Sequence, residues 1–126
     1  MCYLSANSPE YFTSSPFCEA VHSFNARNWY HAHDQFEELW HNASGEIREL
    51  LQGIIQISVA EYHLENGNTR GSTLLMAEGL NHLESFTSLG VGYDLVLLHD
   101  LVRKRLSALQ NQTDPSSLPM PYLKSV

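Results

Sequence analysis

The stretch EIRELLQGIIQISVAEYHLEN, residues 46–66, decides the fold of this chain. Apolar residues occupy almost every side of a helix drawn through it, which predicts the central helix of a domain. Four polar residues interrupt that surface: Arg48, Gln52, Gln56 and His63. At about 100° per residue they fall within roughly 80° of arc and so form one polar stripe. Such a stripe on an apolar helix either lines a site or satisfies a buried polar network.

Helical spacing of apolar residues continues on both sides of this stretch. It predicts further helices over residues 15–24, 29–42, 68–87 and 95–110, with Pro16 near the first start and Asp94 as the N-cap of the last. The fold class is therefore all-α, a compact array of about five helices around the central apolar helix. Residues 15–110 form the predicted domain. Residues 1–14 are expected to be an irregular arm, and residues 111–126 a tail that is either disordered or draped over the surface or over a neighbouring subunit.

Composition excludes several classes of function. The chain has 126 residues, of which 14 are acidic and 7 basic, for a net charge of −7. This charge disfavours nucleic acid as a partner. Arg103, Lys104 and Arg105 are interpreted as cations that complement the dipole at a helix C-terminus. Apolar runs too short for a bilayer argue against a membrane partner. Two cysteines, Cys2 and Cys18, without Cys-x-x-Cys spacing favour free thiols and a cytoplasmic location.

Residues 29–42 carry the densest set of candidate ligands. His33, Glu37 and Trp40 follow one another at i, i+4 and i+7 and so share one side of the predicted helix. His63, on the polar stripe, could add a third ligand from the facing helix. A His/Glu/His set with an open position is the minimum for a catalytic zinc-like centre. Asp34 or Gln56 would support such a centre.

A structural role explains the same residues without any metal. A buried His/Glu/Gln cluster between the two helices would satisfy its own polar groups and fix how the helices meet. The same faces would suit a pocket for a small-molecule ligand, with Trp40, Arg48, Gln52 and Gln56 as lining residues. This interpretation predicts a non-catalytic helical module that forms a homo-oligomer.

Several of these residues resemble the motifs of the domain of unknown function family 309. The resemblance runs over residues 24–83 and rests on Phe24-Asn25, Tyr30-His31-Ala32-His33-Asp34, Glu37, Trp40, Arg48, Gln52-Gly53-Ile54-Ile55-Gln56, His63, Gly67-Asn68 and Gly71. It implies an all-helical fold and carries the label of a metal-dependent hydrolase. The chain departs from the family at His31 and Asp34, where the family usually has glutamate, and near Arg27, where it has glycine.

Two functions of different class follow. In the first, a divalent metal held by His33, Glu37 and His63 activates a water molecule for hydrolysis, with His33, Asp34, Glu37 and His63 as the catalytic candidates. In the second, the cluster is a polar network or a ligand pocket. Glutamine is a poor ligand for transition metals, so the amides on the stripe favour the second. Whether the protein is an enzyme stays open at this stage.

Overall fold

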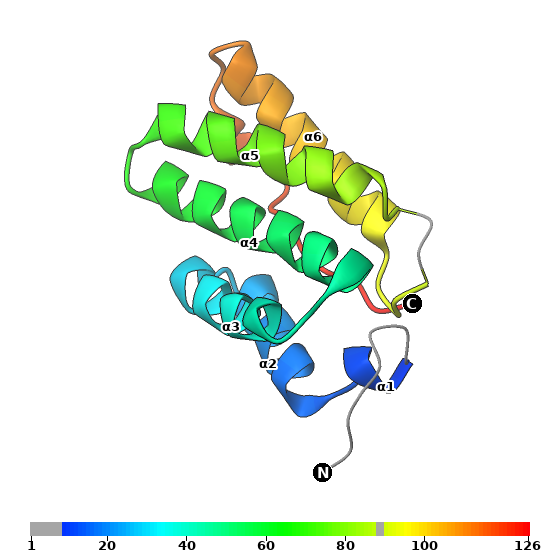
Figure 1. Ribbon diagram of the computed structural model, residues 1–126. Coiled ribbons are helices and arrows are strands. Elements are labelled where there is room, and N and C mark those ends of the chain that lie inside the picture. The colour runs from blue at the N-terminus through cyan, green and yellow to red at the C-terminus, as the bar shows by residue number, and fades with distance from the viewer. Residues whose placement is uncertain (1–8, 88–89) are drawn as a thin grey trace.

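The computed structural model describes residues 9–87 and 90–126, and it confirms the all-α fold (Figure 1). The expected helices are present as α2 (Ser15–Asn25), α3 (Trp29–His41), α4 (Gly45–Glu65), α5 (Thr69–Glu84) and α6 (Leu95–Gln110). Two short elements were not predicted: α1 (Pro9–Phe12), within the arm expected to be irregular, and the 3-10 helix η1 (Pro115–Ser117) in the tail. Residues 1–8, the rest of that arm and the site of Cys2, lie outside the described residues.

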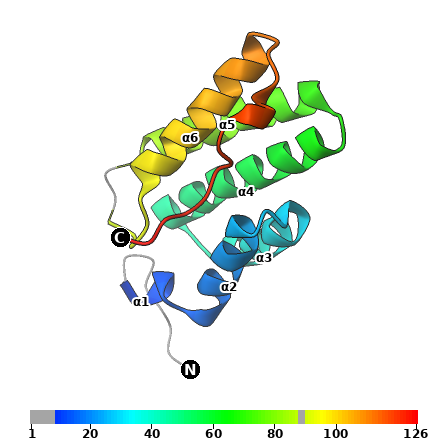
Figure 2. The same ribbon diagram turned by 180° about the vertical axis from the view of Figure 1, so that it is seen from behind.

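Helix α4 lies at the centre of the array. Figure 1 shows it between α3 and α5, and Figure 2, from behind, shows the C-terminal tail crossing its other side while α6 lies against α5. Its apolar residues are buried on nearly all sides: Ile47, Leu50, Leu51, Ile54, Ile55, Ile57 and Ala60. Burial of apolar surface is the main favourable term in folding, so this helix organises the core, as its pattern predicts.

Two glycines bring α4 and α5 unusually close together. A Cβ atom added at Gly79 would lie 2.9 Å from Cγ1 of Ile57 and 3.1 Å from the carbonyl oxygen of Gly53. A Cβ atom added at Gly53 would lie 3.2 Å from the carbonyl oxygen of Gly79. The two backbones therefore approach closely because neither residue has a side chain at the crossing.

Short polar contacts set two of the helix starts. The Asn68 side chain accepts a hydrogen bond from the backbone N–H of Gly71 at 2.9 Å, and Asp94 accepts one from Leu97 at 2.9 Å. These bonds satisfy N–H groups that have no partner within the first turn of a helix. Asp94 is thus the N-cap that the sequence predicts.

The C-terminal tail packs against the helices. The Asn25 side chain donates to the carbonyl of Leu123 at 2.9 Å and accepts from its N–H at 2.7 Å, and Leu123 itself is 3 % exposed. Further along, Tyr93 and Ser125 form an isolated antiparallel bridge. The tail is therefore draped over the surface of its own chain, which is one of the alternatives that the sequence leaves open (Figure 2).

Candidate functional site

The four residues of the polar stripe of α4 differ in how far they are buried. Arg48 is exposed, Gln52 and His63 are half-buried, and Gln56 is 9 % exposed. At one end of the stripe Arg48 contacts Trp40 of α3. Near the other end it is Tyr62, next to His63 and outside the stripe, that contacts Tyr30 of α3. In its middle the stripe contacts α5. The four residues of the stripe therefore differ both in burial and in the helix that they contact.

The candidate residues of α3 interact with one another along their own helix. His33 Nδ1 lies 3.3 Å from Asp34 Oδ1, and His33 Nε2 lies 3.4 Å from Glu37 Oε2. The His33 side chain is 21 % exposed, but those of Asp34 and Glu37 are 54 % and 47 % exposed. The expected buried His/Glu/Gln cluster is corrected on this point: its carboxylates are solvated, and carboxylates at this exposure need no buried partner.

Gln56 turns to α5, whereas the sequence pattern predicts a contact with α3. Its Nε2 donates to Glu78 Oε2 at 3.0 Å. Its Oε1 is buried and has no partner among the described residues. Sequence spacing could not choose between the two helices, because α4 is flanked on both sides and the stripe lies between them.

The structure does not bring the predicted metal ligands together. His63 contacts the Tyr62 ring, at 6.2 Å between centroids, while His33 contacts Tyr30. Within residues 9–87 and 90–126, no group of three or more His, Cys, Asp or Glu side chains is arranged to hold a metal ion. His33, Glu37 and His63 therefore do not form the three-ligand set that the catalytic hypothesis needs.

Three of the four predicted lining residues do meet at one pocket. This α3–α4–α5 pocket has a volume of about 840 Å³ and is lined by Trp40, Gly45, Glu46, Arg48, Glu49, Gln52, His82, Ser85 and Phe86. The fourth, Gln56, lies one turn beyond Gln52 and is not among the lining residues. On its wall the Arg48 guanidinium carbon sits 3.9 Å from the centre of the Trp40 ring. That distance is well within range for a cation–π contact, so the two side chains hold each other in place.

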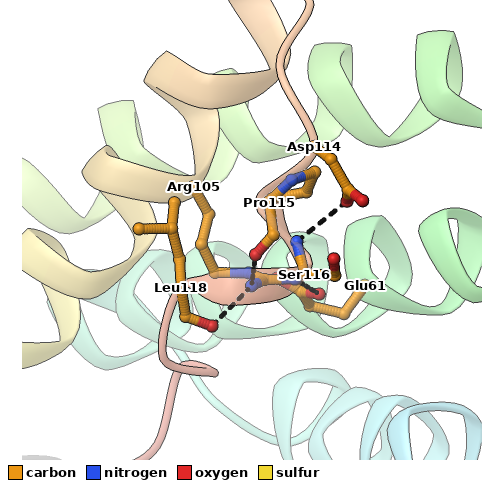
Figure 3. Close-up of polar contacts among 6 residues, drawn as sticks. All are labelled: Glu61, Arg105, Asp114, Pro115, Ser116 and Leu118. Atoms are coloured by element: carbon orange, nitrogen blue, oxygen red, sulfur yellow. Dashed lines mark hydrogen bonds and ion pairs between the residues drawn. The ribbon is translucent and has the colours of Figure 1, made fainter.

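Sequence reasoning missed the most buried polar pair of the protein. Arg105 and Glu61 are each 1 % exposed and form a two-pronged ion pair, with Nε to Oε2 at 2.7 Å and Nη2 to Oε1 at 2.8 Å (Figure 3). Arg105 Nη1 also donates to the carbonyls of Pro115 at 3.1 Å and Leu118 at 3.4 Å. The pair thus joins α4, α6 and the tail. The sequence feature that could have indicated this pair is Glu61 itself, because a charged residue within an apolar helix needs a buried partner.

The interpretation of the basic cluster is corrected accordingly. Arg105 serves the core and not the helix dipole, whereas Arg103 and Lys104 pair with Asp100 at 2.8 and 3.2 Å. Hydrogen bonds from these two cations lower the pKa of the Asp100 carboxyl. This surface group is solvated, and its ion pairs are of the kind that contribute little to stability.

Residues 17–75 match the family model described as Domain of unknown function (DUF309). This span covers most of α2, all of α3 and α4 and the first part of α5, and so includes every residue of the polar stripe. No curated protein matches the chain. In the described part of the chain, no helix combines the length and the hydropathy needed to cross a bilayer.

Proposed function

We propose the function of this chain from the site alone, because the DUF309 family that residues 17–75 match is described only as a domain of unknown function. The chain is a ligand-binding helical module that takes up a small molecule in the α3–α4–α5 pocket. The volume of about 840 Å³ lies within the usual range for ligand sites. One observation carries the proposal. The Arg48 guanidinium is fixed by stacking on Trp40 at the pocket wall. None of the ion pairs among the described residues involves it.

A guanidinium that is stacked on a ring and has no carboxylate partner can bind an anion. Its planar fork carries five N–H donors that match the two oxygens of a carboxylate or phosphate. Stacking uses the face of the group and leaves its edge free. Because Trp40 already restricts the Arg48 side chain, less rotamer entropy is lost when an anion binds.

The other lining residues narrow the class of ligand. Glu46 and Glu49 place two carboxylates on the same wall, while Gln52 and His82 add neutral hydrogen-bonding groups. Two carboxylates beside one guanidinium disfavour a polyphosphate, since like charges repel. They favour a ligand with one anionic group together with N–H or O–H donors. Amino and hydroxy carboxylic acids have this chemistry, and Trp40 and Phe86 offer apolar surface to their side chains.

The test measures the binding of three compounds: phenylalanine, phenyllactate and phenylalaninamide, in which a neutral amide replaces the carboxylate. Binding is monitored by NMR through the shift of the Trp40 indole resonance. We expect both carboxylates to bind, and the amide to bind at least about tenfold more weakly because it cannot pair with Arg48. Arg48→Met should weaken carboxylate binding by a similar factor. Its melting temperature should stay close to that of the parent, since Arg48 is exposed.

Arg70→Met is the matched control. Arg70 is also an exposed arginine and lies at the start of α5, outside the lining of the pocket. It removes the same charge and should leave binding unchanged. Equal losses in the two variants would reduce the effect to net charge, and binding of the amide as tightly as the acid would contradict the proposed role of Arg48.

A further inference from the structure

The histidine of the α3–α4–α5 pocket lies across from the residues of α4 that carry its charges. His82 belongs to the last turn of α5, lines the pocket and is half-buried. It lies outside residues 17–75, the span that matches the family model. Histidine is the side chain that ordinarily changes its charge between about pH 5 and pH 8. A histidine in a ligand pocket can therefore change what the pocket binds.

The position of His82 depends on Gly53 of α4. A Cβ atom added at Gly53 would lie 3.2 Å from the Cβ atom of His82. Because Gly53 has no side chain, α5 can place His82 directly against α4, beside Gln52. Arg48 lies one turn before Gln52 on the same helix, a rise of about 6 Å. His82 and the Arg48 guanidinium thus belong to the same region of the pocket wall.

The His82 ring is free to contact a ligand. No hydrogen bond or ion pair within the described part of the chain involves its ring nitrogens. Among the described lining residues, the charged groups that face it all come from α4, and those from α3 and from the segment after α5 are uncharged, while α6 contributes none. The α4 groups are Glu46, Arg48 and Glu49. Carboxyl and guanidinium groups ordinarily titrate outside the range in which histidine does.

We propose that His82 determines whether this pocket prefers an amino acid or a hydroxy acid, and that the preference shifts toward the hydroxy acid as the pH falls. The inference rests on the proposed function, in which Arg48 binds the carboxylate of the ligand. A neutral imidazole has one nitrogen that accepts a hydrogen bond, and the α-ammonium group of an amino acid supplies the donor. A protonated imidazole has donors only. It repels the ammonium group, but it donates to the oxygen of an α-hydroxyl group.

The experiment measures the dissociation constants of phenylalanine and phenyllactate for the full chain at about pH 7.5 and about pH 5.5, on the two sides of the usual titration of histidine. Both ligands keep their own charges at these values. We expect the ratio of the phenylalanine constant to the phenyllactate constant to rise about tenfold at the lower pH, because a hydrogen bond to the ammonium group is replaced by repulsion.

Two substitutions of His82 separate its charge from its hydrogen bonding. His82→Gln keeps a neutral donor and a neutral acceptor but takes up no proton, so the ratio should stay the same at both pH values. His82→Lys is charged at both pH values and should favour phenyllactate at both. His41→Gln is the matched control, because His41 is an exposed histidine whose ring lies 5.3 Å from that of Trp40, outside the lining of the pocket. Its ratio should change with pH as in the parent, and thermal melts should show that each variant is folded.

The role of His82 and the proposed function fail in different ways. If the parent binds both ligands with a ratio that does not change with pH, the role of His82 is overturned and the carboxylate site at Arg48 stands. A change in ratio that persists in His82→Gln, or that is lost equally in His41→Gln, also overturns it. If neither ligand binds the parent, both proposals are wrong.

Discussion

Burial separates two pairs of charged residues that look alike in the sequence. Arg105 and Arg103 both belong to one basic run, yet Arg105 is 1 % exposed and binds Glu61, while Arg103 lies at the surface and binds Asp100. A buried pair must have every hydrogen bond in place, because removing two charges from water is costly. Arg105 comes close to this condition: four of its five N–H donors bind two carboxylate oxygens and two backbone carbonyls (Figure 3).

Glu61→Gln should lower the free energy of unfolding by about 3 kcal/mol, because it leaves the Arg105 charge buried without its counter-ion. Urea denaturation measures the loss. Replacing both partners, as in Glu61→Leu/Arg105→Met, should recover part of it. Asp100→Asn is the comparison at the surface and should change stability little. If Glu61→Gln and Asp100→Asn had the same small effect, the buried pair would not hold the tail in the way described.

At the scale of elements, the close approach of α4 and α5 depends on glycine at the crossing. Gly53 and Gly79 face each other where the helices meet, and Gln56 reaches Glu78 one turn away. The close contact between α4 and α5 explains why Gln56, in the middle of the stripe, binds α5 and not α3. The Arg48 end of the stripe stays with α3, where Arg48 lies on Trp40 at the wall of the α3–α4–α5 pocket.

Gly79→Ala should destabilise the protein by about 1–3 kcal/mol, although alanine is the better helix former. The added methyl would lie 2.9 Å from Ile57 Cγ1 and 3.1 Å from a backbone oxygen of α4, so the helices must move apart. Thermal and urea unfolding measure the change. Gly90→Ala is the control, since nothing lies within 4 Å of a Cβ atom there. A Gly79→Ala protein as stable as the parent would show that the crossing has room to adjust.

At the scale of the whole molecule, the tail joins residues that are far apart in the sequence. Asn25 and Leu123 are separated by 98 positions and exchange two hydrogen bonds, and Arg105 holds the tail nearer its start. Contacts of such long range are costly in loop entropy, and burial of the tail's apolar residues must offset that cost. The tail therefore completes the side of α4 that α3 and α5 leave uncovered (Figure 2).

Leu123→Ala should lower the free energy of unfolding by about 2–4 kcal/mol, because it opens a cavity where a buried leucine packs. Tyr122→Ala, at the neighbouring position, should cost much less, since Tyr122 is 39 % exposed. Urea denaturation of both variants gives the difference. Equal and small losses would mean that the tail is bound too weakly to contribute to the core.

The local sequence pattern is enough to predict the all-α class, the central place of α4 and the N-cap at Asp94. These follow from local spacing and capping chemistry, which do not depend on what packs against a helix. It also placed Trp40, Arg48 and Gln52 on faces that could meet, because α3 and α4 are joined by a short loop. The resemblance to the family, drawn from the same residues, was confirmed by the match over residues 17–75.

The binding partner of each polar residue, in contrast, depends on how the helices pack. Gln56 binds Glu78 and not His33, the expected metal ligands stay apart, and Arg105 goes inside to meet Glu61. A helical wheel shows on which face of its helix a side chain lies, but it does not show which other helix packs against that face. Arg105 and Glu61 are 44 positions apart, so their pairing depends on how the packing of α6 against α5 places Arg105, and on a tail whose path has no periodic pattern in the sequence.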